Sequence, residues 1–413
     1  MKNRENPPVF TRKYFYTSIS IFSFAAVALY GAPIFLQTVY EPSVQKNESA
    51  AVQGAAPQEI KKLEATHLKT PTPTRAVYMT SCVAGTPNLR KRLVTLIEET
   101  ELNSVVIDIK DYSGNIAFPT DNLLFKGAVG ITCRVNDMRE FIALLHEKGI
   151  YVIGRITVFQ DPFFAKKRPD LAVQKESDKT IWKDYKGISF IDAGAEEYWD
   201  YIVALSHESY AIGFDELNFD YVRFPSDGNM RDIYYPWSEE RIIADPNFGK
   251  AYVLKEFFMY LHGALKDPRV RKGQLVLSAD LFGMTTTNTD DLNIGQVIEF
   301  AEPYFDYIAP MVYPSHYPKG FNGYQNVNAY PYEIVNFSMS RASTRLLAAS
   351  STPLKLRPWL QDFDYPVAYT PEMVRTQIQA VYDAGLDSWM LWNPTNIYTR
   401  SALEPLLDIV PIQ

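Results

Sequence analysis

The stretch FDELNFDYVRFP, residues 214–225, places carboxylates and an arginine inside a run that otherwise has the character of a buried strand. Residues two apart in a strand share a face, so Asn218 and Asp220 point the same way, with Asp220 nearer the end of the strand. Asp215 and Glu216 begin the same run, and we expect them to cap or pair with a neighbouring helix. A charged side chain that loses its hydration needs an ion-pair partner or has a functional role. Asp220 is therefore the first candidate for a catalytic group.

Further polar side chains lie toward the C-terminal ends of other short apolar runs. Together with Asn218, the candidates for contact with a substrate are Asp108, Asp111, Arg155, Arg223, Tyr313, His316, Gln361, Asp362 and Trp392. Asp280, in the run LVLSADLF, is the second carboxylate considered for catalysis, with a structural ion pair to Arg155 as the alternative. Ion pairs would explain one or two buried charges, whereas so many at one end of buried strands indicate a polar cleft.

The histidine and cysteine content argues against several other chemistries. Of the five histidines only His316 lies beside the predicted cleft, so we expect no multi-histidine metal site and no cofactor. The two cysteines fit no zinc or iron–sulfur motif, and we expect buried thiols, with a single disulfide as the alternative in an exported domain. Neither a Ser-His-Asp arrangement nor a G-x-S-x-G elbow stands out. Carboxylates and aromatic side chains remain. A glycosidase uses the first as acid and as nucleophile or base, and the second to stack against sugar rings.

The elements that position these residues follow an alternating pattern. Strand candidates cover residues 76–82, 104–110, 151–159, 214–224, 275–282, 307–313, 356–363 and 388–393. Between them lie helical patterns, among them residues 88–101, 136–149, 195–209, 249–266 and 370–385. This alternation predicts an α/β chain folded as a (β/α)8 TIM barrel. An open doubly wound sheet would carry a glycine-rich phosphate turn after its first strand, and TSCVAGTPN does not match one.

The connections between these elements are unequal in length. Segments 111–134, 160–195, 225–250 and 314–330 are long, and each follows a predicted strand. Helix-to-strand connections are short. Strand-to-helix loops build the active site in this fold, so long loops on that face predict a cleft for a sizeable ligand.

Five motifs resemble those of a known family. They are FDELNFDYVRFP, SADLFG, APMVYPSHY, RPWLQDF and WMLWN, in this order and at predicted strand ends. Together they are similar to a family of bacterial proteins filed as a domain of unknown function and described as glycoside hydrolases with a TIM barrel. The resemblance covers essentially everything after residue 74 and implies a sugar-active barrel that binds a polysaccharide or oligosaccharide. It assigns no catalytic pair.

A two-carboxylate mechanism can be laid over the predicted strands. Chitinases carry D-x-x-D-x-D-x-E on strand four, and Val222 stands here in the place of the glutamate, so that mechanism is not expected. Amylase-type barrels place the nucleophile after strand four and the acid after strand five. We therefore predict a retaining mechanism with Asp220 as nucleophile and Asp280 as acid/base, with Asp108 and Asp111 as reserve acids. The alternative is a barrel that binds carbohydrate at the cell surface without catalysis.

The charge and the N-terminal region bear on location. The chain has 413 residues and a net charge of -7, with basic residues spread along it, so a nucleic-acid partner is not expected. A basic tail at 1–13 precedes an apolar run at 14–40, which predicts a transmembrane anchor or a cleaved signal segment. Residues 41–74 have a linker's composition, and 75–413 form the barrel domain. We expect a membrane anchor with the barrel outside the cytoplasm, at the cell surface or in the periplasm, or a secreted protein after cleavage.

Overall fold

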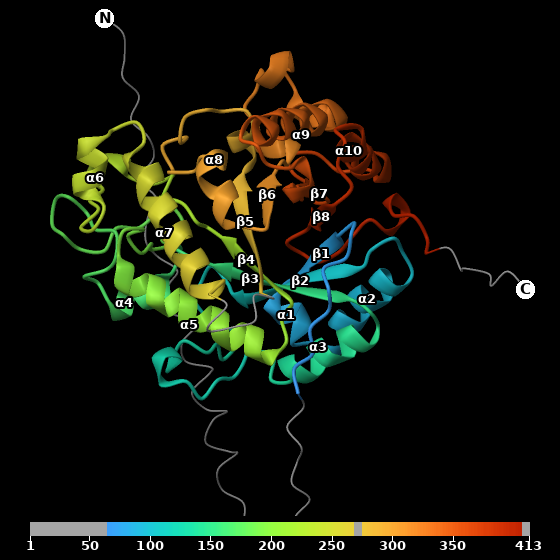
Figure 1. Ribbon diagram of the computed structural model, residues 1–413, viewed down its shortest axis with the longest axis horizontal. Coiled ribbons are helices and arrows are strands. Elements are labelled where there is room, and N and C mark those ends of the chain that lie inside the picture. The colour runs from blue at the N-terminus through green and yellow to red at the C-terminus, as the bar shows by residue number, and fades with distance from the viewer. Residues whose placement is uncertain (1–63, 268–274, 407–413) are drawn as a thin grey trace, which may run out of the picture. The chain divides into compact units, whose positions relative to one another are not determined.

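The computed structural model describes residues 64–267 and 275–406 (Figure 1). The predicted basic tail, the apolar run at 14–40 and most of the predicted linker lie outside the described residues. Within the described ranges, no helix combines the length and the apolar character that crossing a membrane requires. The anchor therefore stays a prediction from the sequence.

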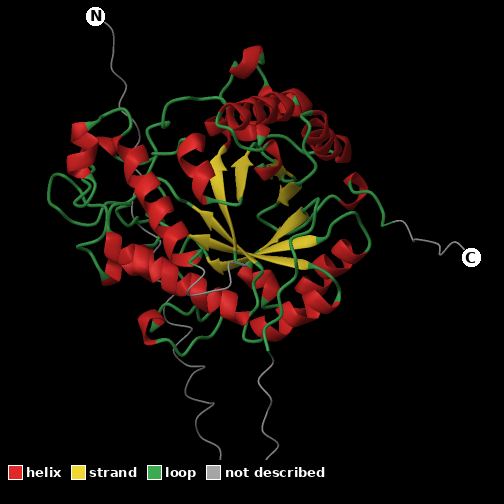
Figure 2. Ribbon diagram, viewed as in Figure 1, coloured by secondary structure: helices red, strands yellow, loops and turns green. Residues whose placement is uncertain are grey.

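Eight parallel strands form a closed barrel in the order β1 to β8, with β1 paired to β8 (Figure 2). The strands are β1 (Arg75–Met79), β2 (Ser104–Lys110), β3 (Tyr151–Thr157), β4 (Glu216–Asp220), β5 (Val276–Phe282), β6 (Tyr307–Met311), β7 (Trp359–Gln361) and β8 (Trp389–Trp392). Each lies within or overlaps a predicted strand segment. The predicted (β/α)8 barrel is confirmed.

Helices surround the barrel and connect its strands (Figure 2). The long ones are α2 (Pro87–Glu98), α3 (Met138–Glu147), α5 (Glu196–Ile212), α7 (Gly249–Leu265), α9 (Pro331–Ala348) and α10 (Pro371–Asp383). Shorter ones are α1 (Ser81–Ala84), α4 (Pro162–Lys167), α6 (Glu239–Ala244) and α8 (Ile298–Ala301). The five segments named from the sequence are helical. The sixth long helix, α9, buries Ser338, Ala342 and Ser343 beside its apolar residues, which weakens its apolar periodicity.

Side-chain alternation along the strands divides the apolar residues into two cores. Val77, Met79 and Ile107 point outward and pack between barrel and helices. Ala76 and Tyr78 point inward, where they belong to a second cluster with residues of the other strands. The barrel interior is thus filled by side chains, and polar groups inside it need partners.

The N-terminal end of the barrel contains the charges that begin the fourth strand. Inside the barrel, Arg357 donates to Glu216 at 2.9 Å, and the Tyr151 hydroxyl donates to the same carboxylate. Outside it, Asp215 accepts hydrogen bonds from the Val152 amide and from Nε2 of His146 in α3. Both acidic residues are structural, as expected. Only Asp215 has the expected helix partner, because the inward direction of Glu216 leads it to the arginine before β7.

The segment before β1 packs against this same end. The Leu68 amide donates to Asp215, and the Thr70 and Tyr151 hydroxyls are 3.0 Å apart. The Leu68 side chain packs against the inner core. Residues 68–70, which the sequence assigned to the linker, therefore pack against the barrel.

Cys82 and Cys133 form a disulfide, which corrects the expectation of two buried thiols. Cys82 lies in α1, directly after β1, and Cys133 lies in the long loop after β2. Loops that follow neighbouring parallel strands emerge at the same end of a barrel. The fold therefore brings together two cysteines that are 51 residues apart in the sequence.

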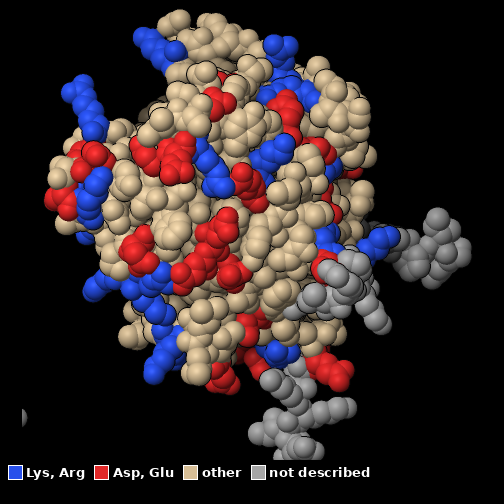
Figure 3. Space-filling model, turned by 60° about the vertical axis from the view of Figure 1, so that its left-hand side comes forward, with Lys and Arg blue, Asp and Glu red and all other residues tan. Residues whose placement is uncertain are grey.

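One face of the surface shows how charge is distributed (Figure 3). Lysine and arginine side chains lie interspersed with aspartate and glutamate there, among many uncharged residues. Among the described residues on this face, no broad basic surface is present of the kind that tracks nucleic-acid phosphates.

Candidate active site

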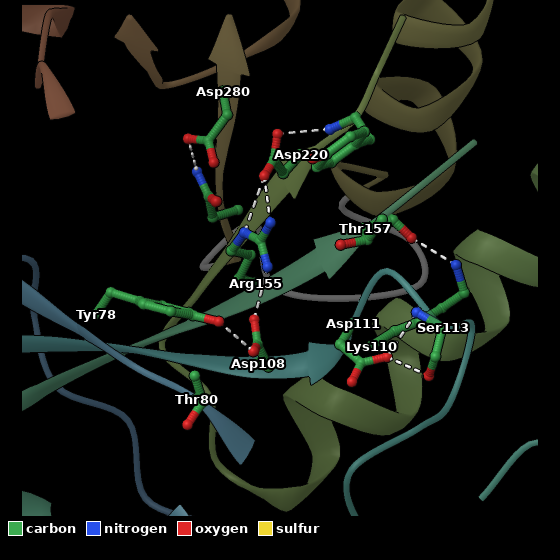
Figure 4. A network of polar contacts seen from close by, with 12 residues as sticks. Tyr78, Thr80, Asp108, Lys110, Asp111, Ser113, Arg155, Thr157, Asp220 and Asp280 are labelled. Atoms are coloured by element: carbon green, nitrogen blue, oxygen red, sulfur yellow. Dashed lines mark hydrogen bonds and ion pairs between the residues drawn. The ribbon is translucent and has the colours of Figure 1, made fainter. Parts of the chain in front are cut away.

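Two carboxylates stand side by side at the C-terminal end of the barrel (Figure 4). Phe219 of β4 pairs with Ala279 of β5, and Asp220 and Asp280 are the next residue on each strand. Neighbouring strands lie about 4.8 Å apart. Both side chains are buried and both line the same cavity. The sequence predicted only that each residue lies near the end of a strand. The register between β4 and β5 shows that the two residues are neighbours.

A guanidinium joins Asp220 to a third carboxylate. Arg155 donates to Oδ2 of Asp220 through Nε at 3.0 Å and through Nη2, and to Oδ1 of Asp108 through Nη1 at 2.7 Å. The Tyr78 hydroxyl donates to Oδ2 of Asp108 at 2.5 Å. The alternative of an ion pair between Asp280 and Arg155 is thereby corrected, because Arg155 pairs with Asp108 and Asp220 instead.

Asp280 sits in a different environment. Its Oδ1 accepts hydrogen bonds from Nδ2 of Asn218 at 2.9 Å and from Nε1 of Trp359 at 2.7 Å. Burial, and then the negative charge of Asp220, raise the pKa of Asp280 well above its usual value. An amide N–H and an indole N–H can only donate, so a proton on this carboxyl belongs on Oδ2. Within the described part of the chain nothing hydrogen-bonds to Oδ2, so that proton is available to a ligand.

The cavity above these carboxylates has a volume of about 440 Å³. Its lining residues are Arg155, Asp220, Tyr221, Arg223, Ser226, Asp280, Phe282, Leu292, Ile294, Met311, Tyr313, His316 and Trp392. Trp392 stacks on Tyr78 with ring centroids 4.0 Å apart and planes 13° apart. Burial lowers the pKa of His316, so its imidazole is neutral at pH 7. Polar groups at the base and aromatic faces on the wall suit a sugar, whose hydroxyls hydrogen-bond and whose ring faces are apolar.

Some candidate residues lie behind this lining. Asp108 and Asn218 do not line the cavity, and they touch the groups that do: Asp108 holds Arg155, and Asn218 holds Asp280. They position the reactive groups.

Three other candidates lie outside the cavity lining, in contrast to the expectation from the sequence. Gln361 accepts from the Ser315 hydroxyl at 2.8 Å, and Asp362 accepts from the backbone amide of Thr399 at 2.9 Å. Asp111 accepts from the Ser113 amide at 2.9 Å. These side chains stabilise the loops around the mouth, because their oxygens are occupied by loop donors.

The hydrogen bonds of Tyr78 and Trp359 were not predicted from the sequence. Both residues were assigned to strands, yet their hydrogen bonds to Asp108 and Asp280 depend on contacts across the barrel. Their inward positions were the available signal, since a buried tyrosine or tryptophan needs a partner for its O–H or N–H.

Tyr221 also escaped notice. Its backbone has φ of 51°, a left-handed conformation uncommon for a bulky residue, directly after β4. Its amide donates to Oδ1 of Asp220 at 2.6 Å, and its side chain lines the cavity. The turn therefore binds Oδ1 of Asp220, whereas Arg155 binds Oδ2.

Within the described ranges, no group of three or more histidine, cysteine, aspartate or glutamate side chains is arranged to hold a metal ion.

Several solved structures align with this chain. The PgaB (BpsB) glycoside hydrolase domain from Bordetella bronchiseptica aligns with a TM-score of 0.56 at 15% identity, covering 78% of this chain and 94% of that one. A hypothetical protein from Ruminiclostridium thermocellum aligns at 27% identity over 49% of this chain and 96% of that one, with a TM-score of 0.42. The α-galactosidase TtGalA from Thermus thermophilus aligns at 15% identity over 82% of this chain and 61% of that one, with a TM-score of 0.44. No curated protein matches the sequence.

A family model matches residues 76–398, from the first strand of the barrel to beyond the last. The matched range contains every residue of the cavity and the five motifs that suggested a glycoside hydrolase. The chain therefore belongs to the family described as "Putative glycosyl hydrolase domain".

Proposed function

We propose that the protein is a retaining glycoside hydrolase of extracellular or envelope polysaccharide, with Asp220 as nucleophile and Asp280 as acid/base. One observation carries the proposal. Two neighbouring carboxylates line one cavity, and their surroundings differ: Asp220 is paired with a guanidinium, and the pKa of Asp280 is raised. Pairs of carboxylates whose environments separate their protonation states divide the acid and nucleophile roles.

The strand register places the two carboxyl groups on neighbouring strands. Retaining enzymes hold their carboxyl groups about 5–5.5 Å apart, and inverting enzymes hold them about 6.5–9.5 Å apart to admit a water. Asp220 and Asp280 directly follow paired positions of adjacent strands. We infer the shorter, retaining separation from this adjacency, and the configuration of the product tests it.

In the first proposed step, the Oδ2 proton of Asp280 passes to the glycosidic oxygen as the bond from that oxygen to the anomeric carbon breaks. Oδ1 of Asp220 forms the new bond to the anomeric carbon and gives a glycosyl ester. In the second step the Asp280 carboxylate takes a proton from water. The water oxygen attacks the anomeric carbon, and the Asp220 carboxylate leaves.

The remaining cavity residues supply binding. The half-buried face of Trp392 is backed by Tyr78, which suits stacking of a sugar ring. Tyr313 and His316 offer polar groups to hydroxyls from the β6 side. Arg155 is engaged by two carboxylates, so its role is to orient Asp220 rather than to bind substrate.

We also propose that the barrel lies outside the cytoplasm, attached to the membrane by residues 14–40. The basic tail and apolar run support this arrangement. The disulfide between Cys82 and Cys133 supports it independently, because disulfides persist in oxidising compartments.

The test uses the full chain in detergent against a panel of plant and bacterial polysaccharides, with new reducing ends measured. We expect Asp220→Asn to lower kcat by at least about 10³-fold, and Asp280→Asn by about 10²–10⁴-fold. Asp362→Asn is the matched control, because Asp362 is a buried carboxylate at the same end of the barrel but outside the cavity.

The first-formed product is then examined by NMR. An unchanged anomeric configuration is expected, and an inverted one would refute the retaining mechanism. If the wild-type protein binds a polysaccharide and releases no ends, the protein is a carbohydrate-binding barrel. Full activity of Asp220→Asn would remove Asp220 from the mechanism.

A further inference from the structure

The cavity contains one cation whose charge is not compensated by a described carboxylate. Arg223 lies beyond the end of β4 and lines the cavity with Asp220 and Asp280. Its Nη1 donates to the backbone oxygen of Phe224 at 3.1 Å and to the Ser226 hydroxyl at 3.0 Å. Within the described chain, no other hydrogen bond and no ion pair involves this side chain. Nε and Nη2 therefore remain open to a ligand.

The neighbouring interactions hold this guanidinium in place. Its carbon lies 5.1 Å from the centroid of the Tyr221 ring, and Tyr221 lines the same cavity. The bonds from Nη1 and the adjacent ring restrict a long side chain that would otherwise be mobile in water. A restricted arginine loses less entropy when it binds a ligand.

The other ionisable groups of the cavity are already accounted for. Arg155 donates to Asp108 and Asp220, so its charge is shared between two carboxylates. Burial raises the pKa of Asp280, which favours its neutral form, and lowers the pKa of His316, which favours the neutral imidazole. Most of the remaining lining side chains are apolar or aromatic. Arg223 is thus a cation without an ion-pair partner in the described chain, and it faces a partly apolar cavity where its attraction for an anion is screened less than in water.

We infer that the substrate is an acidic polysaccharide, in which a uronic acid unit bound beside the scissile linkage places its carboxylate against Nε and Nη2 of Arg223. An arginine fork matches the two oxygens of a carboxylate with parallel hydrogen bonds. A neutral hexose would leave the charge of Arg223 without a partner. This inference rests on the proposed function, because it names the substrate class of the same site.

The test compares acidic polymers with their own neutral derivatives, using the full chain in detergent. Alginate, polygalacturonate and glucuronate-containing polymers are each paired with the carboxyl-reduced polymer, which keeps the linkages and loses the charge. We expect cleavage of at least one acidic polymer, with kcat/KM about 100-fold higher than for its reduced form. Equal rates on both forms would overturn the inference, as would a preference for sulfated or phosphorylated polymers over uronates.

Substitutions then assign the preference to one side chain. Arg223→Gln should lower kcat/KM on the acidic polymer by about 100-fold, mainly through KM, and thereby abolish most of the preference for the acidic polymer over its reduced form. Arg223→Lys should fall between wild type and Arg223→Gln, since it keeps charge without the fork. Arg231→Gln is the matched control, because Arg231 is exposed in the same loop and outside the cavity. An equal loss on both polymers in Arg223→Gln would contradict the assignment.

Binding separates this inference from the proposed function. Oligouronates are titrated calorimetrically against Asp220→Asn, with and without Arg223→Gln. Binding that requires Arg223, without cleavage by the wild type, would retain the ligand class and refute the hydrolase. Cleavage of neutral polymers with no effect of Arg223→Gln would retain the hydrolase and refute the ligand class.

Discussion

At the scale of residues, the two aspartates of the cavity have different surroundings, on which their proposed roles depend. Asp220 accepts from a guanidinium and from the Tyr221 amide, whereas Asp280 accepts from two neutral donors and is deeply buried. Burial and the charge of Asp220 raise the pKa of Asp280, whereas Asp220 is bound directly by the Arg155 guanidinium. The two carboxyl groups therefore differ in environment before a substrate binds, as the proposed acid and nucleophile require.

This asymmetry predicts the alkaline side of the pH–rate profile. A general acid works only when protonated, so kcat/KM should fall as pH rises through the raised pKa of Asp280. The Trp359 N–H stabilises the ionised form and lowers that pKa. Trp359→Phe should therefore move the alkaline limb to higher pH, as measured from kcat/KM between pH 5 and 10.

A matched substitution controls for lost volume. Trp389→Phe removes a buried indole from β8 whose N–H donates to the Tyr382 hydroxyl, away from Asp280. It should lower the melting temperature without moving the limb. A limb that stays in place in Trp359→Phe, or that moves equally in both variants, would show that Asp280 is not the group being titrated.

At the scale of elements, the ends of β5 and β6 approach so closely that only glycine fits between them. A Cβ on Gly283, directly after β5, would lie 2.3 Å from the Met311 carbonyl oxygen and 2.8 Å from the Tyr317 hydroxyl. A backbone oxygen cannot move aside as a flexible side chain can. This contact sets the distance between β5, which carries Asp280, and β6, whose end leads to Tyr313.

Gly283→Ala should therefore separate these strand ends. We expect a loss of about 1–3 kcal/mol in the free energy of unfolding, as for other overpacked sites, measured by denaturant titration. Activity should fall by up to about 100-fold, because a displacement near 1 Å at a reacting group has such an effect.

Gly263→Ala provides the comparison for this strand-end variant. Gly263 lies in α7, and an added Cβ there meets no atom within 4 Å. The substitution should be neutral or stabilise the fold by up to about 1 kcal/mol. Equal stability of the two variants would argue against a steric role for Gly283.

At the scale of the whole molecule, the two ends of the barrel differ: one is closed and the other contains the cavity. The segment before β1 and the Glu216–Arg357 pair close the N-terminal end, and the cavity opens at the other. The disulfide lies on the cavity side, where it connects the first two strand-to-helix connections. It closes a loop with a sequence separation of 51 residues, so it restricts the unfolded chain.

Reduction should consequently lower the stability of the barrel. We expect a loss of about 2–4 kcal/mol on adding a thiol reductant, measured as a lower melting temperature. The double variant Cys82→Ser with Cys133→Ser should start from the lower value and no longer respond to reductant. A wild-type protein purified under oxidising conditions that shows no response would contradict the disulfide.

The order of the elements, and the end of the barrel at which the site lies, could be predicted from the amino-acid sequence. Both are local in origin: the alternation of apolar and amphipathic segments specifies strands and helices, and polar residues at strand ends mark the mouth. Asp220, Asp280, Arg223 and Trp392 could be singled out on that basis, and all four line the cavity.

The contacts between the side chains of the site could be identified only from the tertiary structure. Arg155 pairs with Asp108 and Asp220 rather than with Asp280, and Trp359 reaches Asp280 from β7. Gln361, at the end of the same strand, serves a loop instead. Such contacts depend on the register between strands and on the direction of each side chain across the closed barrel. Both relate residues that are far apart in the chain, so the periodicity of a single segment cannot predict these contacts.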